Sequence, residues 1–240
     1  MKKSSMRTLA LTAILAGTVS IGGIMAYFTD GDTATNTFTV GKISLDLQEP
    51  SWVPPTNITP GQEIAKDPQI KNDGNNEEFV FLKVTVPYAN VVTANEDGTK
   101  GKTADTELFS YDVKDGWTEI DSKRVIDSSS KTVTHLYAYT GETADSMKAL
   151  AVNSSTPSLF DWVRFANIVE DQNLETTTQN IVIEAYGIQT QNIKDEKGNL
   201  DGDNNDGKTL PLDVWKVIEN QNPSLQNTVT EDINTDIKTN

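Results

Sequence analysis

The sequence predicts an all-β protein, an antiparallel β-sandwich with short helical insertions, and three observations support this fold class. Several segments show the alternation of apolar and polar residues that is typical of strands with one buried face. Long polar loops separate these segments, whereas a βαβ fold would place an amphipathic helix after each strand. The 240 residues include no cysteine, so burial of a core and not disulfide bonding must stabilise the fold.

The first 26 residues have the composition of a secretory signal peptide. Three basic residues precede a mostly apolar stretch at residues 9–25, and the small residue Ala26 follows it. We therefore expect export and cleavage between Ala26 and Tyr27. A membrane anchor is the alternative, because about 17 residues is the lower limit for a membrane span. Glycine and serine dilute the apolar character of this stretch, which favours the signal peptide.

The chain is strongly acidic. Its formal net charge is −15. The signal peptide carries three basic and no acidic residues, so its removal changes the charge to −18, with 17 basic against 35 acidic residues. Such a polyanion repels nucleic acid and anionic lipid, both of which are bound through basic surfaces. We therefore expect no nucleic-acid partner, and cations are the favoured ionic partners.

The first strand pattern lies at residues 37–47 and changes phase at Gly41. Phe38 and Val40 precede the glycine and share one parity, whereas the apolar residues after it share the other. A shift of one residue exchanges the two faces of a strand, and a bulge or bend at glycine absorbs such a shift. We expect two short strands that meet at Gly41.

The most regular strand pattern follows a proline-rich loop at residues 49–62. Residues 79–87 alternate, and every second side chain is apolar: Val80, Leu82, Val84 and Val86. We expect this strand to lie in the core and to end at Pro87, since proline lacks the N–H that a sheet requires. Residues 95–106 are charged and glycine-rich and predict an exposed insertion.

The rest of the chain adds strands, two short helical segments and a polar tail. Further strands are expected at residues 131–139, 162–168 and 180–190. Helical character is expected at residues 144–152 and 212–219. We place the sandwich domain at residues 41–220, and residues 221–240 form a polar, disordered tail or tether.

The sequence lacks the motifs of the common hydrolases. A catalytic zinc site usually needs three protein ligands, often two histidines in an HExxH motif, but His135 is the single histidine. A Ser-His-Asp triad would need the same residue, and neither a nucleophile elbow nor a phosphate-binding loop occurs. We expect His135 to be a partly buried strand residue, and we assign no catalytic residue.

A run of acidic and amide residues at 198–208 resembles a calcium loop in composition only. Asp201, Asp203 and Asn205 have the oxygen-bearing side chains and spacing of the first positions of such a loop. The sixth position is Asp206 instead of glycine, and the twelfth is Leu212 instead of glutamate, so an EF-hand is excluded. An irregular calcium site stays open beside the default, a solvated acidic turn; no other metal or cofactor is expected.

Three segments resemble the bacterial family that contains TasA and camelysin. These are the signal sequence ending GGIMA-YFTD, the following TNTFTVGKISLDL, and the unit ITPGQEIAKDPQIKNDG with FVFLKVTVP, and the resemblance returns at residues 159–189. It implies a jelly-roll β-sandwich, export through a SipW-type signal peptidase, and a place at the cell surface or in the matrix. Camelysin-type members are classed as metallopeptidases, but the lone His135 and the missing HExxH argue against that activity here.

In the TasA branch the resemblance implies fibres that assemble by donor-strand complementation. An added strand satisfies the unpaired N–H and C=O groups of an open sheet edge and buries its alternate side chains. Here the donor would be the N-terminal extension at residues 27–40, which begins at Tyr27 and has its anchors at Phe28, Phe38 and Val40. An ordinary first strand or a frayed terminus is the alternative for this segment.

The sequence therefore predicts a secreted structural protein of the cell surface or extracellular biofilm matrix. Its main partner would be a second copy of itself, and an accessory matrix protein could take part. A camelysin-type secreted metallopeptidase, or a monomeric surface-binding sandwich module, is the alternative function.

Overall fold

The computed structural model describes residues 42–55, 57–172, 174, 179–195, 198–199 and 208–226. The predicted signal peptide, the donor segment with Gly41, the three calcium candidates and residues 227–240 lie outside these described residues.

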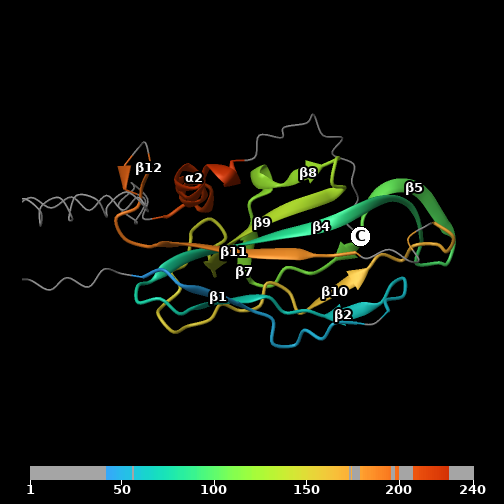
Figure 1. The fold of residues 1–240 in the computed structure, drawn as a ribbon, viewed down its shortest axis with the longest axis horizontal. Coiled ribbons are helices and arrows are strands. Elements are labelled where there is room, and N and C mark those ends of the chain that lie inside the picture. Colours follow the sequence, from blue (N-terminus) through green and yellow to red (C-terminus); the bar gives the residue numbers. More distant parts are fainter. Residues whose placement is uncertain are drawn as a thin grey trace, which may run out of the picture. The chain divides into compact units, whose positions relative to one another are not determined.

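The main layer is an antiparallel sheet with the strand order β11-β4-β9-β7 (Figure 1). Its strands are β4 (Glu78–Ala94), β9 (Thr132–Gly141), β11 (Val182–Gln189) and β7 (Gly116–Glu119). Two further strands extend it, since β5 (Lys100–Glu107) pairs with β4 and β8 (Val125–Asp127) pairs with β9.

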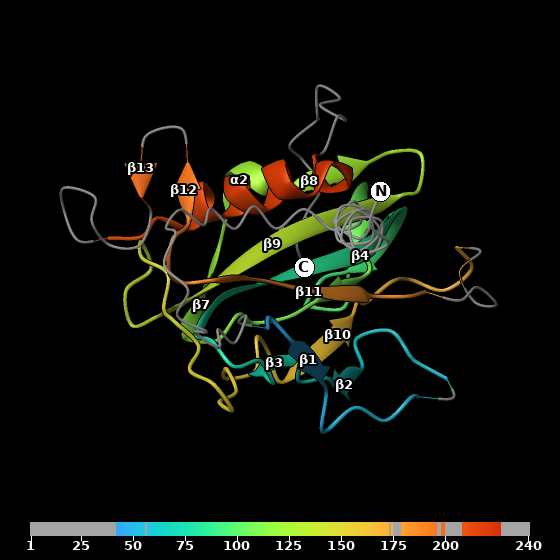
Figure 2. The ribbon, with the colours of Figure 1, turned by 60° about the vertical axis from the view of Figure 1, so that its left-hand side comes forward.

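A second layer of short antiparallel strands faces the main sheet, as Figure 2 shows. It contains the sheet β2-β10-β6 and the pair β1-β3. The bounds are β2 (Glu63–Ala65), β10 (Trp162–Phe165), β6 (Phe109–Ser110), β1 (Leu45–Gln48) and β3 (Gln69–Asn72). The predicted fold class, a jelly-roll-like antiparallel β-sandwich with short helical insertions, is confirmed.

The main core fills the space between these two layers. The even-numbered residues of β4 up to Val86 project into it, as their alternation predicted: Val80, Leu82, Val84 and Val86. They share this core with Ile70 of β3, Phe109 of β6, and Val163 and Phe165 of β10. Ile43, which shares the parity of Leu45 and Leu47, lies outside β1 and is 42% exposed. Leu45 and Leu47 do pack against the core.

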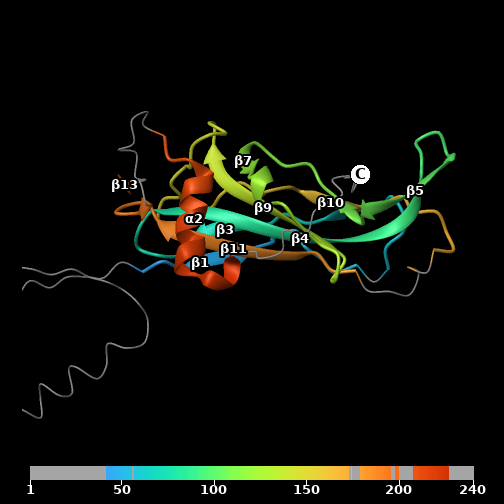
Figure 3. The same ribbon diagram turned by 90° about the horizontal axis from the view of Figure 1, so that it is seen from above.

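Helix α2 (Pro211–Gln221) covers the opposite face of the main sheet, where Phe79 and Phe81 project (Figure 3). Pro211 occupies the first turn, where its missing N–H costs no hydrogen bond. The buried residues of the helix recur at helical spacing and form a second core with β4: Val214, Trp215, Val217 and Ile218. The helix predicted at residues 212–219 is confirmed.

Short elements complete the described chain. The 3-10 turn η1 spans Asp121–Lys123, and the strands β12 (Lys194–Asp195) and β13 (Gly198–Asn199) pair with each other. A second 3-10 turn, η2 (Pro223–Leu225), follows α2, and its Leu225 packs against the second core.

The expected end of β4 at Pro87 is wrong, because the strand continues to Ala94. Pro87 lies where β4 exchanges one neighbour for another: β11 pairs with it up to Thr85, and β5 pairs with it beyond Pro87. The Pro87 carbonyl accepts a hydrogen bond from the Leu108 N–H, whereas the Leu108 carbonyl accepts one from Ala166. No partner therefore requires an N–H from Pro87, and the strand tolerates it.

Two further expectations need correction for a related reason. Most of residues 95–106 are exposed, as predicted, but they contain the first seven residues of β5, which forms a hairpin with β4, so only the turn of this segment is irregular. Residues 144–152 are not helical, because Met147 donates to the Thr209 carbonyl and Leu150 exchanges both backbone hydrogen bonds with Glu78. In both segments, backbone pairing with β4 outweighs local propensity.

Candidate functional site

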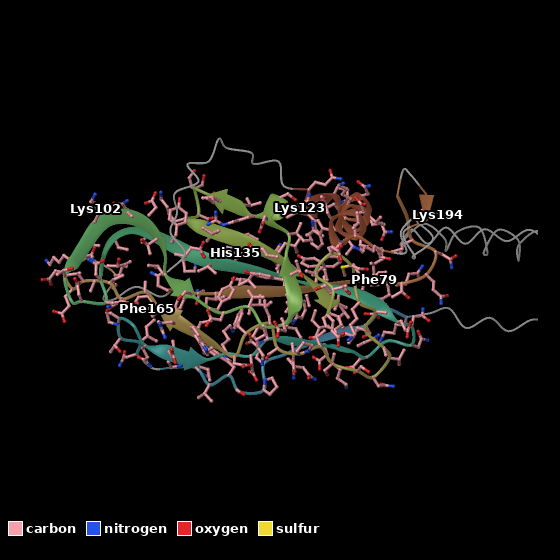
Figure 4. All side chains as sticks on the ribbon, turned by 180° about the vertical axis from the view of Figure 1, so that it is seen from behind. Phe79, Lys102, Lys123, His135, Phe165 and Lys194 are labelled. Atoms are coloured by element: carbon pink, nitrogen blue, oxygen red, sulfur yellow. The ribbon has the colours of Figure 1, made fainter. Side chains whose placement is uncertain are left out.

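The buried polar cluster of the sandwich is built around His135 on β9. Figure 4 shows this residue in the middle of the sheet, away from the hairpin that carries Lys102. Its Nδ1 lies 2.6 Å from the Glu119 Oε1 on β7, and its Nε2 lies 3.1 Å from the Glu107 Oε2 at the end of β5. Because a carboxylate only accepts hydrogen bonds, both ring nitrogens donate and the imidazole is protonated.

Electrostatics keep this proton in place. Burial alone would lower the pKa of His135, but hydrogen bonds to Glu107 and Glu119 outweigh it and raise the pKa to about 9. Arg124 follows η1 and supplies a second cation, 3.0 Å from the Glu107 Oε1. Two carboxylates and two cations therefore balance one another, as buried charges require.

Two tyrosines close the cluster on its core side. The hydroxyl groups of Tyr111 and Tyr137 lie 3.0 Å apart, and both rings lie beside the imidazole of His135. Burial raises the pKa of both phenols above the ordinary range, so both stay neutral hydrogen-bonding groups. Each polar side chain of this cluster therefore has a hydrogen-bond or ion-pair partner, as expected of a buried network that stabilises the fold.

This arrangement leaves His135 without a lone pair for a metal ion. A metal-binding histidine must offer one unprotonated nitrogen, whereas both nitrogens of this ring bond carboxylates. Within the described ranges, no group of three or more histidine, cysteine, aspartate or glutamate side chains is placed to hold a metal ion.

A groove of about 760 Å³ exposes the edge of the main core. Its floor comes from β2 and β10, and its walls come from the proline-rich loop and the residues before β11. The apolar lining includes Ile58, Ile64, Val163, Phe165, Leu174 and Ile181. Four of these, Ile58, Ile64, Leu174 and Ile181, are only partly buried against the main core.

One side of the groove carries a charged residue under an aromatic ring. The Lys66 ammonium lies 4.4 Å from the centre of the Trp52 ring and 2.6 Å from the Glu49 Oε1. The two contacts fix the proline-rich loop to β2 at this point. The groove thus has an ordered wall although the loop has no regular secondary structure.

A buried carboxyl group lies where residues 42–45 enter the sandwich. Glu78 is fully buried, and its Oε1 accepts a hydrogen bond of 3.2 Å from the Ser44 N–H. Its Oε2 has no hydrogen-bond partner among the described residues and lies beside Gly187 of β11. Burial raises the pKa of Glu78, and the hydrogen bond from Ser44 opposes that shift only in part.

The structure places one of the residues singled out from sequence, His135, which lies inside a strand as expected. Ala26, Tyr27, Phe28, Phe38, Val40 and Gly41 lie outside the described residues, as do Asp201, Asp203 and Asn205. Sequence reasoning missed the partners of His135, because Glu107 and Glu119 lie 28 and 16 positions away from it. It also missed the groove, which combines segments distant in sequence and has no local signature.

The geometry defines an antiparallel β-sandwich protein with an internal ion-pair cluster and an open apolar groove. In the part of the chain that is described, no helix is long and apolar enough to cross a membrane.

The chain belongs to the family described as camelysin metallo-endopeptidase, whose model matches residues 1–174. No curated protein matches it. Among solved structures, a type II cohesin domain from the cellulosome of Acetivibrio cellulolyticus is similar at 12% identity with a TM-score of 0.21. The match covers 60% of this chain and 84% of the cohesin chain, and at this score it supports no functional argument.

Proposed function

We propose that this chain is an exported structural protein of the cell surface or biofilm matrix that assembles into fibres by donor-strand complementation. Residues 27–40 of one copy, freed by cleavage after Ala26, would insert into the apolar groove of the next copy. The observation that carries the proposal is the groove itself, in which the described residues cover apolar side chains such as Ile58 and Ile181 only in part.

An inserted strand suits the groove chemically. Among the described strands, β2 pairs with β10 alone, so its other edge offers free backbone groups beside the apolar lining. The donor segment supplies Phe28, Phe38 and Val40, and each such side chain contributes roughly 1.5–3 kcal/mol when it is buried. Because each copy gives one segment and accepts another, the contact is head-to-tail, and it builds an open filament when the rotation between successive copies does not close a ring.

The peptidase function suggested by the family description is less well supported. His135 is the single histidine, and it donates from both ring nitrogens to carboxylates. A catalytic zinc site needs a vacant nitrogen and further ligands beside it. The ion-paired cluster therefore favours a structural role for His135.

The proposal is tested with two proteins, one starting at Tyr27 and one starting at Gly41. The longer protein should form fibres on prolonged incubation, seen by electron microscopy, and the shorter one should keep β-type circular dichroism but stay monomeric. Fibres from the shorter protein would rule out the donor segment. Failure of the shorter protein to fold would mean that residues 27–40 pack into the core of the same copy.

The acceptor side is tested separately in the protein starting at Tyr27. Ile181→Glu puts a charge into the groove and should abolish fibres, whereas Val113→Glu changes a residue that is 41% exposed and lies outside the groove. Equal assembly of both variants would overturn the assignment of the groove as acceptor. Fibres that need an added matrix protein would identify an accessory partner.

A further inference from the structure

A second hollow, of about 680 Å³, lies on the other side of β10 from the groove. Alternation along β10 separates the two, since Val163 projects into the core and the groove, whereas Trp162 and Arg164 line only the hollow. Its rim comes from the turn at Gly61, the end of β4 and the residues after β6. Segments distant in sequence therefore build this hollow.

The wall formed by β10 presents an aromatic ring in a fixed position. Trp162 is half-buried, and the Arg164 guanidinium lies 5.3 Å from the centre of its ring. Arg164 in turn forms an ion pair with Glu63 on the neighbouring β2, so the cation is held against the indole. A half-exposed, oriented indole offers an apolar surface at low cost in conformational entropy.

The rim of the hollow presents polar side chains that have no interaction partner among the described residues. Glu96 and Asp112 are exposed carboxylates, and Asn167 contributes a side-chain amide. None of these three side chains has a hydrogen-bond or ion-pair partner in the described part of the chain. The hollow therefore combines one aromatic surface with acceptors and donors that converge from different segments.

We propose that this hollow binds a saccharide chain that carries free hydroxyl and ammonium groups. The C–H face of a pyranose ring packs on an indole, and carboxylates and amides bond to its hydroxyl groups. Glu96 and Asp112 have no ion-pair partner among the described residues, and in a chain of net charge −15 they favour an amino sugar over a neutral sugar and repel a uronic acid. Pro60 and Phe165 line both the groove and this hollow, whereas Trp162, Glu96 and Asp112, which carry this proposal, line only the hollow.

Calorimetric titration of the mature protein with three oligosaccharides tests the proposal. The glucosamine hexamer should bind, the neutral glucose hexamer should bind at least about tenfold more weakly, and the galacturonate hexamer should not bind. Absence of binding by all three, or tightest binding of the galacturonate oligomer, would overturn the proposal.

Variants locate the site. Trp162→Ala should weaken binding of the glucosamine oligomer at least about tenfold, and Glu96→Gln with Asp112→Asn should remove its advantage over the neutral oligomer. Trp52→Ala is the matched control, because Trp52 is also half-buried but lines the groove instead. Unchanged binding by the double carboxamide variant, or an equal loss in Trp52→Ala, would place binding elsewhere. If Trp162→Ala does not fold, the variant with Glu96→Gln and Asp112→Asn still tests whether the hollow binds the oligosaccharide.

Discussion

His135 and Glu107 form a buried ion pair, with 3.1 Å between Nε2 and Oε2, that joins the middle of β9 to the end of β5. Both side chains are almost completely inaccessible, at 5% and 1% exposure. The pair lies where the chain leaves β5 and enters β6 in the second layer. It therefore fixes the point at which the two layers of the sandwich connect.

The stability of the protein should fall as the pH rises from about 6.5 to about 9. The pKa of His135 is raised from 6.5 to about 9, so the folded state binds the proton more tightly than the unfolded state. The resulting stabilisation is complete below pH 6.5 and is lost as the pH rises through about 9. A shift of this size corresponds to on the order of 3 kcal/mol.

Urea unfolding at pH 6, 7.5 and 9.5 measures this loss. His135→Gln removes the titrating group, so this variant should be less stable at pH 6 and should show little change across the window. An equally steep decline in His135→Gln would assign the pH dependence to other groups.

Glu78 should destabilise the fold progressively as the pH rises toward neutrality. Its pKa is raised in the folded state because of burial, so its favourable contribution is present at acidic pH, below its unfolded pKa, and is lost as it ionises. Glu78→Gln should therefore gain stability relative to the wild type between pH 4 and pH 7. Denaturant titrations across this range check the slope, with the exposed Glu142→Gln as control. A constant difference between Glu78→Gln and wild type would contradict the prediction.

Trp215→Ala should be among the most destabilising single changes in the chain. The Trp215 ring is 3% exposed and lies 5.2 Å from the ring of Phe81 and 5.4 Å from that of Tyr186. Its removal leaves a cavity under α2, and such truncations cost about 3–5 kcal/mol. Trp52→Ala, which removes a half-buried ring, should cost about 1 kcal/mol. Equal losses in thermal or urea unfolding would mean that α2 packs less tightly than described.

The purified mature protein should not hydrolyse casein in a chelator-sensitive manner. The reason is the double hydrogen bonding of His135, which leaves no nitrogen for zinc. The measurement is casein hydrolysis with and without chelator, for wild type and His135→Ala. Activity that both the chelator and the substitution abolish would establish the peptidase function and would refute the structural role of His135.

Sequence patterns predicted those parts of the fold in which one element carries its own periodicity. The apolar alternation of residues 79–87 identified the central strand and both of its faces, and residues 212–219 identified α2. The existence of a strand around His135 followed from the same kind of pattern. These elements have local signals because one face of each is buried continuously.

The parts that could not be predicted depend on backbone pairing and contacts that leave no apolar periodicity in the segment itself. The hairpin strand β5 is polar because most of its side chains are exposed or half-exposed, so its sequence is that of a loop. Residues around Met147 have good helix formers, but their N–H groups bond to other segments. The ion pairs of His135, the groove and the hollow beside β10 also form only in the tertiary fold. No local sequence pattern predicts them.

The pairing of β11 with β4 sets an order of events during folding. Val182 pairs with Thr85 and Gln189 with Glu78, so the main sheet closes only after most of the chain is available. Formation of the hairpin of β4 and β5 closes only a short loop, so this hairpin can form early. The strand β11 can pair with β4 only when a long loop closes, which is slower. Until residues 182–189 are available, the edge of β4 between Glu78 and Thr85 has no partner strand, so the main sheet is completed late in folding.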